Sequence, residues 1–157
     1  MNNVKFNRLD LGRIKTYPLA QRRSLTSCAD ILVSPTSTAP TLEQQLMSRV
    51  ENAVSQIRAA RARGASVMLM YGAHLLRNGA ALILEELMRA GWVTHIATNG
   101  AGTIHDWEYA WLGKSTEGVE ENVATGTFGC WEETASSIHL AILAGALDGL
   151  GYGSVLG

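Results

Sequence analysis

Two short segments combine glycine with side chains that can contact a small ligand. The first follows a continuous apolar run at 66–71, and the second is at the end of an expected strand at 93–98. Glycine permits a sharp turn and lets the backbone approach a ligand closely, and backbone N–H groups ahead of a helix can hold an anion or a hydroxyl group. We expect one small-ligand site here, built by Gly72, Ala73, His74, Thr98, Asn99, Gly100, Ala101 and Gly102. The alternative is an ordinary strand-to-helix turn that carries a surface histidine.

Three titratable residues follow the second turn. His105 and Glu108 are three residues apart and share one face of the expected helix. A histidine and a carboxylate beside a ligand can transfer protons near neutral pH. We therefore treat His105, Asp106 and Glu108 as candidate catalytic residues. The alternative is that the two carboxylates only complement the helix dipole.

A further pair of carboxylates, Glu132 and Glu133, begins the last expected helix, directly after a glycine-rich turn at 126–129. They are candidates for binding a cationic substrate, or they stabilise the helix electrostatically. His95 lies within an expected buried strand and His139 on the last helix, so we assign both structural roles.

Other site motifs are incomplete. The full G-x-G-x-x-G is missing, because His105 stands three residues after Gly102. Gly113-Lys114-Ser115 resembles the end of a phosphate-binding loop, but Glu108 occupies the position of the required first glycine. Cys28 and Cys130 are isolated, which favours reduced, buried thiols over a disulfide or a metal site.

The apolar periodicity predicts the elements that carry these residues. We expect an amphipathic helix over 41–64, opened by a capping box between Thr41 and Gln44, and helices over 75–90, from 104 and over 131–147. The apolar run at 66–71 predicts a strand covered on both faces, and we expect a second strand of the same buried kind at 93–98. A third, short strand is possible at 31–33. Helices alternating with such strands predict an α/β fold with a Rossmann-like parallel sheet flanked by helices.

The composition fits one domain. The chain has 157 residues, 46% of them apolar, and a net charge of −1. We expect an irregular N-terminal segment at 1–40, which holds all three prolines, and a single α/β Rossmann-like domain at 41–157. No basic stripe, signal segment or membrane span stands out, so we expect a cytoplasmic protein that binds neither nucleic acid nor membrane.

The stretch from about Met70 to Gly113 resembles the deoxyhypusine synthase family and its bacterial relatives. In that family two short turns contact NAD, and acidic residues near the substrate follow. The resemblance assigns the NAD contacts to residues 72–74 and 98–101, and the substrate side to His105, Asp106 and Glu108. It implies NAD, or NADP, as the cofactor, and transient hydride and imine chemistry on an amine or a small polar metabolite.

This chain is shorter than the family enzymes. It has only Lys5, Lys15 and Lys114, none of them in the motif of the family's catalytic lysine. Three functions stay open: an NAD(P)-dependent enzyme or its nucleotide-binding half, a non-catalytic ligand-binding or assembly subunit, and a cofactor-free hydrolase or isomerase. A sheet this small would leave apolar surface exposed. We therefore expect a second copy, as in a homo-oligomer, or a companion chain that supplies the absent half.

Overall fold

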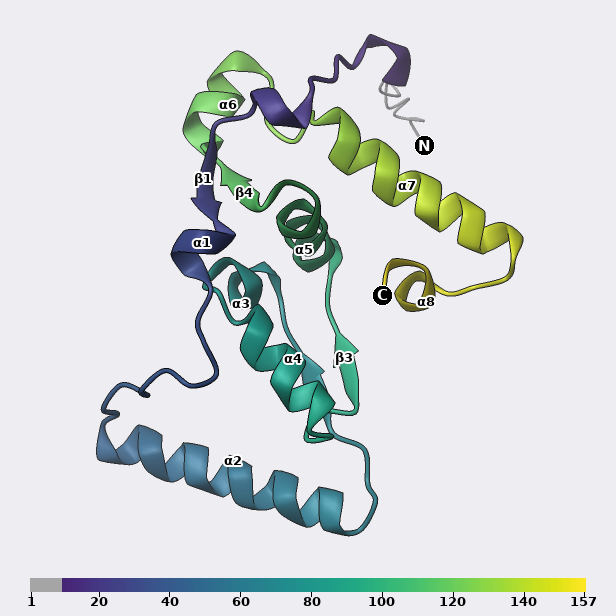
Figure 1. Ribbon diagram of the computed structural model, residues 1–157. Coiled ribbons are helices and arrows are strands. Elements are labelled where there is room, and N and C mark those ends of the chain that lie inside the picture. Colours follow the sequence, from purple (N-terminus) through teal and green to yellow (C-terminus); the bar gives the residue numbers. More distant parts are fainter. Residues whose placement is uncertain (1–9) are drawn as a thin grey trace, which may run out of the picture. The chain divides into compact units, whose positions relative to one another are not determined.

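The computed structural model describes residues 10–157 (Figure 1). The chain is mixed α/β and forms two compact units. One unit is Ser24–Thr116, and the other combines the chain up to Arg23 with Glu117–Gly157. The described part of the segment before residue 41 is divided between these two units.

The unit Ser24–Thr116 contains nearly all the strands of the described chain. Its sheets have two strands each, β2 with β3 and β1 with β4, so the described residues do not form the larger parallel sheet expected from the sequence. The last residue of β4 falls in the other unit. The elements in order are β1 (Ser24–Ser27), α1 (Cys28–Ile31), α2 (Gln44–Ala62), β2 (Met68–Met70), α3 (Ala73–Arg77), α4 (Ala81–Arg89), β3 (His95–Ala97), α5 (Gly100–Leu112) and β4 (Lys114–Glu117).

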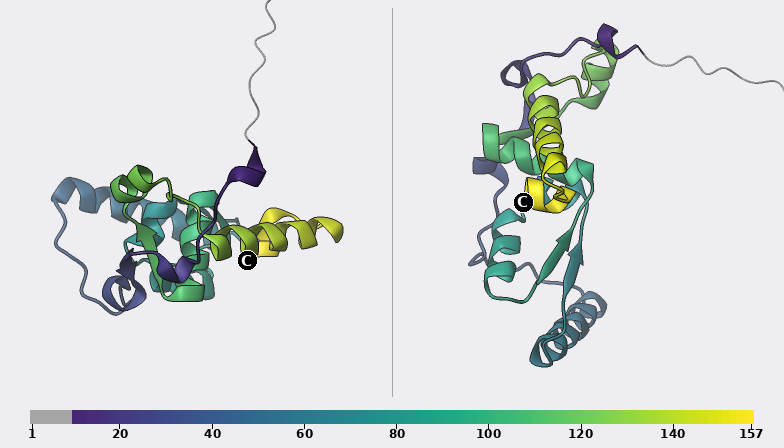
Figure 2. Two further views of the ribbon diagram at one scale, coloured as in Figure 1. Left: turned by 90° about the horizontal axis from the view of Figure 1, so that it is seen from above. Right: turned by 90° about the vertical axis from the view of Figure 1, so that its right-hand side faces the viewer.

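Strands β2 and β3 pair in parallel, with Leu69 opposite Ile96, and lie side by side in Figure 2. The parallel arrangement confirms the expected strand-helix-strand unit. The expectation that both faces are covered is wrong for the described chain, since Met68, Met70 and Ile96 are 58%, 76% and 46% exposed. With only two strands and short crossing helices, this unit lacks the second helical layer that would bury them.

The helix expected over 75–90 is two helices, α3 and α4. The break is at Gly79, whose φ of +83° favours glycine. A Cβ atom there would lie 1.7 Å from the carbonyl oxygen of Ile31, so the close passage of this segment requires glycine. Ile31 itself ends helix α1, which corrects the short strand expected at 31–33.

Helix α2 begins later than expected. Glu43 is its N-cap and makes no capping hydrogen bond through its side chain, so the predicted capping box at Thr41 is wrong. No residue of α2 is buried. The amphipathic pattern is present, but Leu46, Met47 and Val50 stay 40–47% exposed. Arg61 anchors the end of α2 by donating to the carbonyl oxygens of Gly91 and Ala65, both at 2.7 Å.

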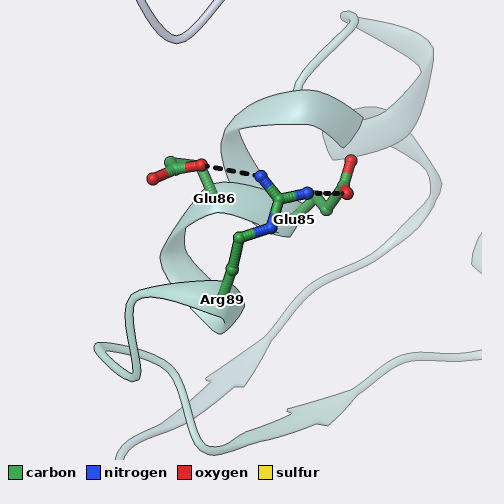
Figure 3. A network of polar contacts seen from close by, with 3 residues as sticks. All are labelled: Glu85, Glu86 and Arg89. Atoms are coloured by element: carbon green, nitrogen blue, oxygen red, sulfur yellow. Dashed lines mark hydrogen bonds and ion pairs between the residues drawn. The ribbon is translucent and has the colours of Figure 1, made fainter.

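The outer face of α4 is polar. Arg89 donates to the carboxylates of Glu85 and Glu86 one helical turn earlier, the latter at 3.3 Å (Figure 3). All three side chains are more than half exposed. The opposite face carries Leu84, which is only 6% exposed and belongs to the core.

The second unit is helical, and its core includes Leu19, Trp131 and Ile138. Its elements are two 3-10 helices (Leu11–Arg13 and Leu19–Gln21), α6 (Val119–Thr125), α7 (Glu132–Leu147) and α8 (Tyr152–Leu156). Helix α7 confirms the expected helix over 131–147. Its Gly145 packs so closely that a Cβ atom would lie 2.0 Å from the side chain of Val155 in α8. The described helices include none with the length and apolar character needed to cross a bilayer.

Candidate functional site

The two glycine turns lie side by side where β2 and β3 end. The backbone N–H of Tyr71 donates to the carbonyl oxygen of Ala97 at 2.9 Å, which continues the ladder one step beyond the strands. A Cβ atom at Gly72 would lie 3.7 Å from the Asn99 amide nitrogen. Parallel pairing therefore brings both turns to one edge of the sheet, where open parallel sheets bind ligands. We call this region the carboxyl edge.

The second turn begins helix α5. Asn99 is the N-cap, and its Oδ1 accepts a hydrogen bond from the N–H of Gly102 at 3.0 Å. A Cβ atom at Gly102 would lie 2.1 Å from Oγ1 of Thr98, so this glycine is needed for the packing of the turn itself. By contrast, a Cβ atom at Gly100 would meet nothing within 4 Å. The open side of the turn is thus at Gly100, at the positive end of the α5 dipole.

Asp106 and Tyr71 form an electrostatic pair at the carboxyl edge. Burial raises the pKa of the Asp106 carboxyl group above its ordinary value, although part of the side chain stays exposed. Burial also raises the pKa of the Tyr71 phenol, and the negative charge of Asp106 raises it further. A side-chain hydrogen bond with Thr98 partly opposes this. A carboxyl group that has a raised pKa and stays accessible can exchange protons with a ligand.

His105 and Glu108 lie on a different side of α5 and meet at Ser115. The Ser115 hydroxyl donates to Oε2 of Glu108 at 2.5 Å and lies 2.7 Å from Nδ1 of His105. A serine has one hydroxyl hydrogen, so Nδ1 of His105 must be the donor in the second contact. Glu108 and Ser115 are buried, at 1% and 0% exposure.

The contacts continue from β4 to β1. Thr26 Oγ1 lies 2.7 Å from the hydroxyl oxygen of Tyr109 and 3.0 Å from Oγ1 of Thr116. Thr116 is buried and has a φ of +68°, which costs energy for a threonine. We call the set Thr26, His105, Glu108, Tyr109, Ser115 and Thr116 the Ser115 network.

The sequence placed His105 and Glu108 on one face of the helix, and the structure brings these two side chains together at Ser115. His105 and Glu108 belong to the Ser115 network, and Asp106 belongs to the carboxyl edge. Sequence reasoning placed Tyr71 in the first turn without giving it a role of its own, and it missed Ser115. Tyr71 was detectable as the last residue of its apolar run, whereas Ser115 lies in a segment without periodicity.

The remaining candidates have these positions. His74 is exposed in the first turn of α3. Glu132 and Glu133 lie in the other unit, where Oε2 of Glu133 accepts a hydrogen bond from the N–H of Leu19 at 2.6 Å. A structural contact therefore occupies part of the Glu133 carboxylate, and substrate binding by the pair stays a prediction. His95 and His139 are exposed, so the interior position expected for His95 is wrong.

The described residues were also compared with the requirements of a metal site and of a disulfide. Among residues 10–157, no three His, Cys, Asp or Glu side chains are grouped so as to hold a metal ion. Cys28 and Cys130 are free thiols, each half-buried. Comparisons with known protein families, with curated proteins and with solved structures found no match for this chain.

Proposed function

We propose that this chain is a deoxyhypusine synthase-like protein that binds NAD or NADP at the carboxyl edge. The observation that supports this most directly is the parallel pairing of β2 with β3, which brings the turns at 72–74 and 98–102 together. The proposal takes β2 and β3 as part of a larger Rossmann-like sheet that another chain completes.

The residues present fit a dinucleotide. The N–H groups at the start of α5 suit a phosphate, and the space beside Gly100 admits one without displacing a side chain. Gly72, Ala73 and His74 would contact the same ligand from the neighbouring turn. When bound, the nicotinamide supplies hydride transfer. Asp106 would exchange a proton with an amine or a small polar substrate.

Isothermal titration calorimetry with NAD and with NADP tests this proposal. We expect saturable binding of one of them and its loss in Gly100→Val, because the added methyl groups fill the space beside the turn. Gly151→Val is the matched control, since Gly151 also faces open space and has extended backbone. Absence of binding by the unsubstituted chain, or undiminished binding by Gly100→Val, would contradict the proposal that the carboxyl edge binds NAD or NADP.

A second function is favoured by one observation, the hydrogen-bonded chain from Glu108 through Ser115 to His105. It holds a histidine beside a serine hydroxyl and a buried carboxylate, a combination that can transfer protons in a cofactor-free hydrolase or isomerase. In that case NAD and NADP give no heat on titration. A non-catalytic subunit is a third outcome, which fits the absence of a lysine in the family motif. Hydride exchange with a labelled amine separates this outcome from an NAD-dependent enzyme.

A further inference from the structure

Helix α2 carries a hollow on its exposed surface. The hollow has a volume of about 340 Å³ and is lined by Val50, Glu51, Val54, Ser55 and Arg58. Val50 and Val54, its two apolar lining residues, are 41% and 39% exposed. Since α2 buries none of its residues, its apolar side chains gain little within this chain. The surface has the composition of a helix–helix contact that lacks its second member.

The charges at the two ends of this hollow are opposite. Glu51 and Arg58 are seven residues apart, which is about two helical turns or roughly 10 Å along the axis, and so they share one side of α2. That separation is too long for them to pair within the helix, where partners are three or four residues apart. Neither side chain has a hydrogen bond or an ion pair with another described residue.

We propose that this face of α2 pairs with α2 of a second copy in the antiparallel direction. Around a two-fold axis that passes near Val54 and Ser55, Glu51 of each copy meets Arg58 of the other. The pairing forms two ion pairs and brings the exposed valines of both copies together. An interface of this kind is self-complementary, as a two-fold dimer requires. A parallel pair would instead bring like charges together, which is unfavourable.

The inference does not depend on the proposed function, because α2 carries none of the residues assigned to the carboxyl edge. A second hollow, of about 470 Å³, lies between α2 and the start of β2 and β3. Val54 and Arg58 line both hollows. A helix seated on α2 would therefore also shield part of this second apolar surface.

Charge exchange in the full-length chain tests the pairing, with the mass in solution measured by sedimentation equilibrium. We expect the unsubstituted chain to dimerise, and Glu51→Arg and Arg58→Glu each to weaken the dimer by about tenfold or more. The double variant should dimerise again. An equimolar mixture of the two single variants should form a 1:1 heterodimer, because one supplies only positive and the other only negative partners.

The matched control is Arg49→Glu. It changes the net charge as Arg58→Glu does, but it lies nine residues away, about two and a half turns, on the opposite side of the helix. Dimerisation should be unchanged in this variant. Circular dichroism checks that every variant keeps its helix content. A monomeric unsubstituted chain, a dimer that survives both single variants, or a folded double variant that stays monomeric would each overturn the proposal.

Discussion

The carboxyl edge and the Ser115 network both include residues of helix α5, but their polar groups differ in exposure to solvent. In the network, hydroxyl and carboxylate groups are buried and hydrogen-bonded to one another, as at Glu108 and Ser115. At the carboxyl edge, Asp106 and Thr98 remain partly exposed, and the space beside Gly100 is open. Polar groups that the chain satisfies internally stabilise the fold, while those directed to an accessible edge can bind a ligand.

The largest change in the free energy of unfolding should come from a substitution in the Ser115 network. Ser115→Ala removes a hydroxyl donor from a carboxylate that is 1% exposed. Hydrogen bonds to buried charged groups contribute about 1.5–3 kcal/mol, so we expect the free energy of unfolding to fall by that amount. Urea denaturation measures the loss. A fall of less than about 0.5 kcal/mol would mean that the network is not a stabilising element.

The next largest loss in the free energy of unfolding should come from a substitution of Gly102, because the turn at the carboxyl edge has no room for a side chain there. In Gly102→Ala the new methyl group meets Oγ1 of Thr98 at 2.1 Å. We expect a loss of about 1–3 kcal/mol in the free energy of unfolding, as for other overpacked positions. Thr98→Ala removes the clashing oxygen, and the double variant should regain much of the loss. Additive losses in the double-mutant cycle would contradict this account of the turn.

The sequence predicts the features of the fold that depend on local periodicity, but not those that depend on contacts between distant segments. Local periodicity correctly predicted the parallel unit of β2 and β3 and the long helix α7. It missed the break at Gly79, because that break depends on the distant carbonyl oxygen of Ile31. The three-residue spacing predicted the shared face of His105 and Glu108, but not their contact with Ser115, whose segment has no periodicity. Contacts between distant segments are therefore what the residue pattern alone did not contain.

Asp106 should have a smaller effect on the free energy of unfolding than the Ser115 network, and this effect should depend on pH. Its pKa is raised in the folded chain above the ordinary value of 3.8, so folding favours the protonated form. Stability from this group is present below pH 3.8 and is lost as the pH rises through the folded pKa. We expect Asp106→Asn to be more stable than the unsubstituted chain at pH 7, with the gain disappearing toward acidic pH in urea denaturation. A gain independent of pH would contradict the assignment.

The same substitution should change the titration of Tyr71. The charge of Asp106 is one of the causes that raise the pKa of the phenol, so Asp106→Asn should lower it toward its ordinary value. Ultraviolet absorbance of the ionised phenol follows the titration, and Tyr71→Phe identifies its contribution among the four tyrosines. If the Tyr71 titration stays unchanged in Asp106→Asn, the two groups do not interact and the carboxyl edge loses its electrostatic pair.

The smallest change in the free energy of unfolding is expected for Arg89, which belongs to neither region. Its contacts show how much solvent-exposed ion pairs contribute to stability. Arg89 contacts Glu85 and Glu86, but all three side chains are more than half exposed (Figure 3). Exposed helical ion pairs contribute about 0.3–0.5 kcal/mol each and are screened by salt. Arg89→Ala should therefore lower the free energy of unfolding by less than about 1 kcal/mol, and less still in high salt. A loss as large as that of Ser115→Ala would show that burial does not distinguish the Ser115 network from the surface.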